Sequence, residues 1–494
     1  MKREITGGVE SASVSPDHSE VDLQFEKRLI RKMDLHVCPW VMLIYLVSFL
    51  DRVNIGNARL FGMEADLGMK GSQYQTAVSV LFVTYLVSHS LKCRVTWSSK
   101  NSDHPDMASS VYASSPHLTF FTVAFITFAW GVVATLTGIV QSYGGLIACR
   151  LILGLFEAGL FPGMAVYLTF WYTRKELALR IGYLFVSSAL AGAFGLAMDH
   201  HHRVRPSTLP TRKLTPSRGI PSVLLGLLTP FVLADDPDSA SWLTPAEKAY
   251  IRARKGESAD AQKFHWHDVR KCFSDPKVYA FAAAQFGCDT MLYGFSTFLP
   301  TIISQLGRWN VTQTQLLTVP CYVLGAVTYL TTAYLSDRYQ VRGWFCVAGG
   351  LISVLGYLIL LVPVSSGGHY AGCFLVAMGL YVVVGIPLSW LPNNIPRYGK
   401  RTSATGFQLM IGNASGVMAP FLYATHEKPR YIRGHAVSLA MVAFATCVYG
   451  IMAVVYARIN ARRDRGEEEH KLVGKTHEQV DALGDESPHF RYMT

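Results

Sequence analysis

Repeated apolar runs of about 20 residues constrain this 494-residue chain more than any other feature of its sequence. Half of its residues are hydrophobic and only 16% are charged, whereas soluble globular domains contain about 25% charged residues. A helix of about 20 apolar residues is long enough to cross the hydrocarbon core of a bilayer. The runs therefore predict an all-α integral membrane protein instead of a series of soluble domains.

The apolar runs form two sets of six, separated by a hydrophilic stretch. We expect the first set at 38–57, 76–91, 118–140, 144–172, 178–198 and 219–234. The second set is expected at 277–303, 315–336, 344–364, 368–392, 402–424 and 434–457. The predicted parts are an N-terminal tail (1–37), a six-helix bundle (38–234), a linker (235–276), a second six-helix bundle (277–457) and a C-terminal tail (458–494).

The distribution of basic residues predicts the orientation of these helices. With the N-terminus inside, the inside segments carry 32 lysines and arginines and the outside loops carry 11. The positive-inside rule then places both termini and the linker in the cytoplasm of a multi-pass protein, which we expect in the plasma membrane. Because these residues are dispersed among loops and form no single stripe, we expect no nucleic-acid partner despite the net charge of +11.

Four ionisable residues lie inside two of the apolar runs. Asp51 and Arg52 are in the first run, and Arg150 and Glu157 are in the fourth. Ionisable groups in lipid are costly unless they are paired or line a polar cavity. Residues seven apart share a helix face but lie about 10 Å apart along the axis, so Arg150 and Glu157 need partners elsewhere.

We predict that Asp51 pairs with Arg150 and that Arg52 pairs with Glu157. Two interpretations of such pairs remain open. They are either static locks between the first and fourth helices or parts of a titratable site on a transport pathway.

Several motifs resemble those of a known transporter family. They include FLDRVNIGNA (49–58), CRLILGLFEAGLFPG (149–163) and KRTSATGFQLMIGNASGVMAP (400–420). The chain is similar to the anion:cation symporter family of the major facilitator superfamily, and more narrowly to fungal permeases for allantoate and nicotinic acid. The resemblance implies twelve transmembrane helices as two six-helix bundles that rock around a site near the membrane midplane.

The resemblance also implies an activity and roles for individual residues. The expected activity is symport of a small organic anion, such as nicotinate, allantoate or a sugar acid, with a proton as coupling ion and no cofactor. Asp51 and Glu157 would carry protons, and Arg52 would meet the anion. In this scheme the arriving anion competes for the arginine and frees the acid to take a proton. The expected partners are this anion and the lipid bilayer, and we expect a monomer.

Further candidate residues lie elsewhere in the chain. Arg150 and three polar residues of the seventh and eleventh runs, Tyr293, Gln408 and Asn413, could bind substrate or bond across helices. The stretch AYLSDRYQVRG (333–343) resembles a short cytoplasmic loop of the superfamily. By that resemblance Asp337, Arg338 and Arg342 would form a charge clasp that depends on the state of the transporter.

Two polar segments, 88–117 and 199–218, do not fit the family pattern. They suggest one alternative to a working symporter, a non-functional product of a mispredicted gene model. A separate alternative is a transporter-like nutrient sensor without net flux. The run Asp199-His-His-His202 lacks a further ligand at metal-binding spacing, so we expect no metal site. The chain also lacks nucleophile-elbow and P-loop motifs, so we do not expect an enzyme.

Overall fold

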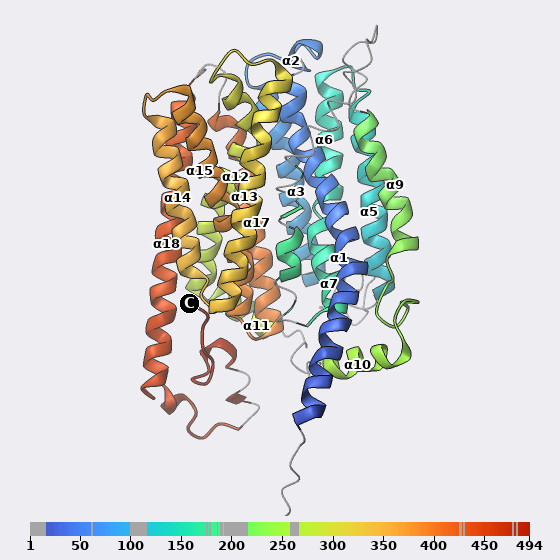
Figure 1. Cartoon of the computed structure of the whole chain (residues 1–494), viewed down its shortest axis with the longest axis vertical. Helices are drawn as coiled ribbons and strands as arrows, with labels where there is room; N and C mark the ends of the chain where they lie inside the picture. The colour runs from blue at the N-terminus through green and yellow to red at the C-terminus, as the bar shows by residue number, and fades with distance from the viewer. Residues whose placement is uncertain are drawn as a thin grey trace, which may run out of the picture.

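The computed structural model is helical throughout the regular elements that it describes (Figure 1). It describes residues 16–60, 63–98, 116–173, 216–256, 266–423, 430–476 and 483–494, together with Glu176, 179–184, 186–187, Ala191, Glu427 and 479–480. The helices lie side by side in two groups that follow the order of the chain (Figure 1). The expected all-α architecture is therefore confirmed for these residues.

The N-terminal group contains six helices and one short turn of helix. They are α1 (Pro16–Leu60), α2 (Met63–Asp66), α3 (Gln73–Ser98), α5 (Pro116–Thr137), α6 (Tyr143–Glu157), α7 (Leu160–Trp171) and α9 (Pro216–Val232). Helical backbone is also present at 179–184 and 186–187. Within this group α5 packs on α9 and α3 packs on α6.

The C-terminal group contains the helices that follow the linker. They are α12 (Pro276–Ser304), α13 (Val311–Tyr339), α14 (Gly343–Leu361), α15 (Ser366–Gly385), α16 (Pro387–Asn393), α17 (Tyr398–Leu422) and α18 (Ile432–Asp464). Helix α14 packs on α15 and α18, and α12 packs on α17. The two groups meet where α3 contacts α17 and α1 contacts α12.

Three helices extend beyond the ranges expected from the apolar runs. Helix α1 begins at Pro16 and not at 38, so much of the expected N-terminal tail is helical. Helix α3 continues to Ser98 into a segment that we expected to end it, and α18 continues to Asp464. These extensions are amphipathic or polar turns of helix, which a search for apolar runs cannot detect. Residues 99–115 and 199–215 of the two atypical segments lie outside the described residues.

Two expected helices are each divided into two. The fourth run is interrupted between α6 and α7, because Pro162 has no amide hydrogen to donate to the carbonyl of Ala158. The tenth run is interrupted at Ile386, directly before Pro387 begins α16. In both places proline removes a backbone hydrogen bond within an otherwise apolar stretch.

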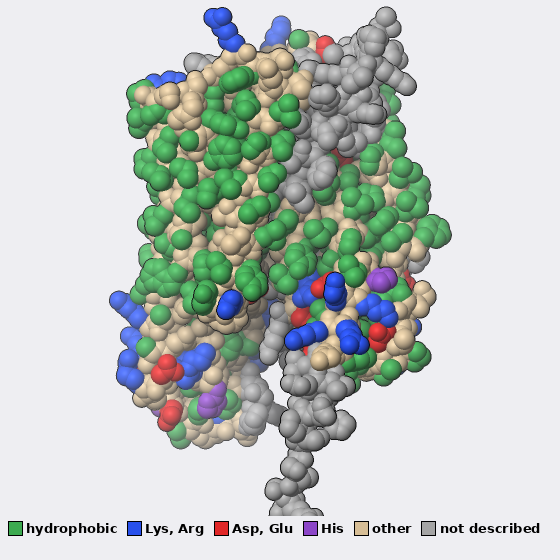
Figure 2. Space-filling model, in the orientation of Figure 1, with side chains coloured by type: hydrophobic (Ala, Val, Ile, Leu, Met, Phe, Trp, Pro, Cys, Tyr) green, Lys and Arg blue, Asp and Glu red, His purple; other side chains and the backbone are tan. Residues whose placement is uncertain are grey.

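The surface of the molecule matches a membrane environment. Five of the described helical stretches are long and apolar enough to cross a bilayer: Gln24–Arg52, Val311–Tyr339, Gly343–Leu361, Ser366–Asn393 and Ile432–Asp464. In the view of Figure 2 hydrophobic side chains cover most of the visible wall, and charged side chains gather towards the lower end. We call this lower end, where the linker helices lie, the linker end, and the opposite end the far end.

The linker contains two helices, and each is attached to a different bundle. Helix α10 (Pro245–Gly256) begins with a capping box, because Thr244 Oγ1 accepts from the Glu247 amide and Glu247 Oε2 accepts from the Thr244 amide. Glu247 also pairs with Lys32 of α1 at 2.9 Å. Helix α11 (Trp266–Phe273) is held to the C-terminal bundle by an ion pair of 2.6 Å between Asp268 and Arg397.

The last part of the chain packs on the linker end of the C-terminal bundle instead of forming the free tail that we expected. Asp485 accepts from Lys400 at 2.7 Å and from Lys277 at 2.8 Å. The Met493 carbonyl accepts from the Trp390 indole at 2.7 Å, and the Tyr492 ring stacks on Tyr456 at 4.5 Å. We call residues 483–494 the docked segment.

Replacing Asp485 with Asn should release the docked segment. Burial raises the pKa of this carboxyl, but attraction to Lys277 and Lys400 outweighs burial and leaves the pKa below its ordinary value. Removing one partner of a buried ion pair costs about 3 kcal/mol. We expect Asp485→Asn to make the segment accessible to limited proteolysis at neutral pH.

The lowered pKa also sets the direction of a pH effect. Because Asp485 holds its proton less tightly when docked, docking is strongest above the ordinary aspartate pKa and is lost as pH falls through the lowered value. Glu467→Gln is the control, because Glu467 pairs with Arg465 on the exposed surface, where ion pairs contribute little. Equal proteolysis of both variants would contradict the docking role of Asp485.

Candidate functional site

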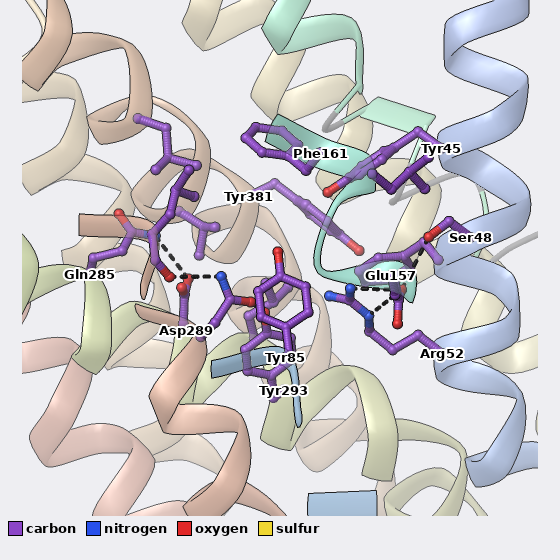
Figure 3. Close-up of a pocket in the computed structure, with 17 residues that line it drawn as sticks. Tyr45, Ser48, Arg52, Tyr85, Glu157, Phe161, Gln285, Asp289, Tyr293 and Tyr381 are labelled. Atoms are coloured by element: carbon purple, nitrogen blue, oxygen red, sulfur yellow. Dashed lines mark hydrogen bonds and ion pairs between the residues drawn. The ribbon is translucent and has the colours of Figure 1, made fainter. Parts of the chain in front are cut away.

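A cavity lies at the junction of the two bundles, and both contribute to its walls (Figure 3). Its room for water-sized molecules is about 50 Å³. Helix α1 supplies Tyr45, Ser48 and Arg52, whereas α12 supplies Gln285, Asp289 and Tyr293. Aromatic rings and a few buried polar groups are the usual lining of a small-molecule site.

Arg52 and Glu157 form the ion pair that we predicted, on the N-terminal wall of this cavity. Oε1 of Glu157 accepts from Nη2 of Arg52 at 2.7 Å and from Nε at 2.9 Å. The Ser48 hydroxyl donates to the same oxygen at 3.1 Å. Glu157 Oε2 is buried and has no hydrogen-bond partner among the described residues. The pair joins α1 to the end of α6 and presents a charged group at the centre of the molecule.

The second predicted pair, Asp51 with Arg150, is absent from the ion pairs of the described residues. Asp51 is buried and accepts from the Ser222 hydroxyl of α9 at 3.2 Å. Arg150 is also buried, and its Nε has no hydrogen-bond partner in the part of the chain that the structure describes. Asp51 and Arg52 are adjacent, so their side chains point about 100° apart on the helix. Arg52 faces the cavity, and Asp51 is directed towards α9.

A second, smaller pocket adjoins the first and shares Arg52 and Tyr293 with it. Arg150 lines this second pocket. No acidic side chain lies within ion-pair distance of Arg150 in the described part of the chain. Arg52 and Arg150 therefore lie at adjoining pockets. In the described part of the chain, Arg52 has an acidic partner in a direct ion pair and Arg150 does not.

The other predicted site residues lie on the C-terminal wall. The Tyr293 hydroxyl donates to Asn413 Oδ1, and Asn413 Nδ2 donates to the Leu409 carbonyl at 2.7 Å. Gln408 is fully buried, and its Nε2 donates to Gln285 Oε1 at 3.1 Å. Tyr293 and Asn413 line the cavity, whereas Gln408 stands behind it and supports α12.

Asp289 also lies in the wall of the same cavity, although we did not predict it as a site residue. Its Oδ1 accepts from Gln285 Nε2 at 2.8 Å. In Figure 3 Asp289 and Gln285 stand on one side, and Arg52, Glu157 and Ser48 stand on the other. The missed signal was the same one that identified Arg52, namely an ionisable residue in the middle of an apolar run.

Contacts between the bundles close the far end of the cavity. The Ser79 hydroxyl of α3 donates to the Val417 carbonyl of α17 at 2.8 Å. Gly416 lies so near Phe82 that an added Cβ would be 2.4 Å from the ring. Arg59 of α1 lies over the Phe298 ring of α12, with 5.8 Å to its centroid. We call this set of contacts between α1, α3, α12 and α17 the far-end contact.

The predicted charge clasp is present only in part. Arg342 Nη2 pairs with Asp337 Oδ1 at 2.8 Å, and Arg342 also donates to the Ser389 hydroxyl. Arg338 is exposed and joins no ion pair in the described residues. Asp337 and Arg342 belong to the same bundle and close the turn between α13 and α14. In this conformation the pair therefore stabilises a turn and does not connect the bundles.

Known proteins similar to this chain include an uncharacterized transporter of Schizosaccharomyces pombe. The two are 36% identical over 484 residues, which cover 96% of this chain and 91% of the relative. The chain belongs to the major facilitator superfamily. The model of that family, the Major Facilitator Superfamily, also matches residues 218–420 directly. The protein is thus a multi-pass membrane transporter of this superfamily.

A second relative has a named substrate. The high-affinity nicotinic acid transporter of Saccharomyces cerevisiae is 31% identical over 483 residues, covering 97% of this chain and 86% of the relative. Among solved structures, the proton:xylose symporter XylE bound to 6-bromo-6-deoxy-D-glucose superposes with a TM-score of 0.66 at 10% identity. That superposition covers 87% of this chain and 96% of the symporter, and it shows the shared fold.

Glu157→Gln should destabilise the folded protein because it leaves the Arg52 guanidinium buried without its acid. We expect a loss of about 3 kcal/mol, as for other buried ion pairs with one partner removed. Thermal unfolding of the purified protein in detergent, followed by a thiol-reactive dye that labels the buried cysteines as they become exposed, measures this loss.

Ser48→Ala is the matched comparison for Glu157→Gln. It removes one neutral donor from the same carboxylate oxygen, for which we expect a loss of about 1 kcal/mol. If the two variants unfold at the same temperature, the ion pair stabilises the folded protein no more than a single hydrogen bond does, which would contradict its proposed contribution to stability.

Proposed function

We propose that this transporter moves a small organic anion together with a proton by alternating access. The observation that carries the proposal is the Arg52–Glu157 ion pair, which is buried in a cavity lined by both bundles. A cation held in a low-dielectric cavity binds a carboxylate well. Arg150 in the adjoining pocket adds a second positive charge without a direct acidic partner among the described residues.

The ion pair supports a simple exchange mechanism. A carboxylate that enters the cavity competes with Glu157 for the guanidinium of Arg52. Glu157 then loses the cation that stabilises its charged form and takes up a proton. Proton and anion arrive together, so the loaded cavity gains no net charge before the bundles rock. Asp51, which lies against α9, is a further candidate proton carrier of this proposal.

The proposed substrate class follows from the charges, the aromatic lining and the similarity to a nicotinic acid transporter. Tyr45, Tyr85, Phe161 and Tyr381 line the cavity together with Arg52. Such a site suits a small carboxylate, and a flat ring would pack on the aromatic side chains. Nicotinate is therefore the first probe, followed by allantoate and a sugar acid.

The proposed setting is the plasma membrane, with the linker end in the cytoplasm and the protein working as a monomer in the bilayer. The excess of lysine and arginine in the segments assigned to the inside supports this orientation.

Uptake assays in proteoliposomes test the proposed function. Labelled nicotinate, allantoate and gluconate are supplied with and without an inward proton gradient. We expect accumulation of at least one of them against its gradient, accompanied by proton entry that an internal pH dye reports. Binding without uptake would favour a nutrient sensor, and uptake that ignores the proton gradient would remove proton coupling from the proposal.

Arg52→Lys should greatly reduce uptake of the transported anion. Lysine keeps the charge but lacks the planar pair of donors that bind a carboxylate in bidentate fashion. We expect KM for the anion to rise by about tenfold or more, since a charged hydrogen bond contributes about 1.5–3 kcal/mol. Initial rates of labelled uptake at a range of concentrations measure this change.

Arg252→Lys is the matched control for this substitution. Arg252 pairs with Asp238 on the exposed surface of α10, away from the cavity, so uptake should match the wild type. A normal KM in Arg52→Lys would show that the arginine is structural and does not bind the anion.

A further inference from the structure

Asp289 is a buried acid that the mechanism above does not use. It lies near the middle of α12, only 4% of its surface is exposed, and it lines the central cavity. Its one hydrogen bond among the described residues comes from the neutral amide of Gln285, which is itself held by Gln408. No lysine or arginine in the described part of the chain lies within ion-pair distance of it.

Among the described residues, the titratable side chains around Asp289 come from α1, α3, α6, α12, α15 and α18. They are Arg52, Glu157, Tyr45, Tyr85, Cys288, Tyr293, Tyr381 and Tyr449. All but Arg52 and Glu157 are phenols or a thiol, and these are neutral near pH 7. The guanidinium of Arg52 is already bound by Glu157.

Helix α17 packs closely on the second oxygen of this carboxyl. A Cβ at Gly412 would lie 2.3 Å from Asp289 Oδ2, so a larger residue there would displace the acid. Oδ1 is occupied by the Gln285 amide. The site thus holds the carboxyl in one place and supplies a single neutral donor to it.

An ionised carboxylate in this position is expensive, because it is removed from water without a cation bound to it. Glu157 differs, since two nitrogens of Arg52 stabilise its charged form. We propose that Asp289 is the coupling acid of the C-terminal bundle, which must be protonated before the bundles can close on a bound anion.

The charges around the cavity explain why this proton is needed. The Arg52–Glu157 pair is neutral, and this wall stays neutral when an anion replaces Glu157 beside Arg52 and Glu157 takes up a proton, as proposed above. An ionised Asp289 would then face the bound anion with a like charge in a low-dielectric space. A second proton, on Asp289, removes that repulsion.

The position of Asp289 also connects protonation to movement. Both arginines belong to the N-terminal bundle, whereas Asp289 belongs to the C-terminal bundle. When the bundles close on an anion held by the arginines, they bring this anion towards Asp289. The proton comes from the aqueous side to which the cavity is open, binds a carboxylate oxygen, and leaves on the other side with the anion. This step rests on the proposed anion transport.

Asp289→Asn tests the inference, because asparagine has nearly the same shape as the protonated acid and cannot release a proton. The variant is reconstituted in proteoliposomes with the anion that the wild type accumulates. We expect the number of protons that enter with each anion to fall by about one and proton-driven accumulation to weaken, because only Glu157 still takes up a proton, while exchange of labelled for unlabelled anion is kept. Asp289→Glu keeps a titratable carboxyl and should retain proton-driven accumulation at a lower rate.

The outcomes separate this inference from the proposed function. If the wild type accumulates none of the anions, the proposed function fails, and the inference fails with it. If Asp289→Asn admits as many protons per anion as the wild type, only the inference fails. Loss of exchange as well as accumulation in a variant with normal thermal unfolding would mean that Asp289 binds the substrate directly, which also overturns it. Asp238→Asn, on the surface of the linker, is the control and should behave as the wild type.

Discussion

The Arg52–Glu157 ion pair is the interaction on which the centre of this transporter depends. Two charges removed from water are tolerated because each neutralises the other and Ser48 supplies a further hydrogen bond. The pair fastens α1 to α6, so it stabilises the N-terminal bundle. In the proposed mechanism the same neutrality makes the pair exchangeable, because an incoming carboxylate would replace one anion beside Arg52 with another at little electrostatic cost.

Much of the fold follows from the apolar runs alone. The runs predicted the cores of α5, α9, α12, α13 and α14 to within a few residues. They could not predict the first turns of α1 or the last turns of α18, where polar helix continues into water. They also could not show that residues 483–494 pack on the bundle, because that depends on Asp485 meeting lysines distant in the sequence.

The charges along the sequence predicted the Arg52–Glu157 ion pair, but they could not predict contacts that depend on how the helices pack. Arg52 and Glu157 were found together because each needed an opposite charge from another helix. The direction of Asp51 depends on how α9 lies against α1, which spacing along one helix does not reveal. Asp289 was overlooked because no opposite charge in its own run drew attention to it, and that isolation is the property that makes it chemically interesting.

The far-end contact has a consequence for the cycle of the transporter. The Ser79–Val417 hydrogen bond holds α3 against α17. Gly416 has no side chain, so the Phe82 ring of α3 packs directly on the backbone of α17. Opening that end must separate these surfaces and admit water to both. In a closely packed interface such separation is cooperative, so the far end behaves as a two-position gate and not as a gradually widening channel. A leak through a half-open gate is thereby suppressed by packing alone.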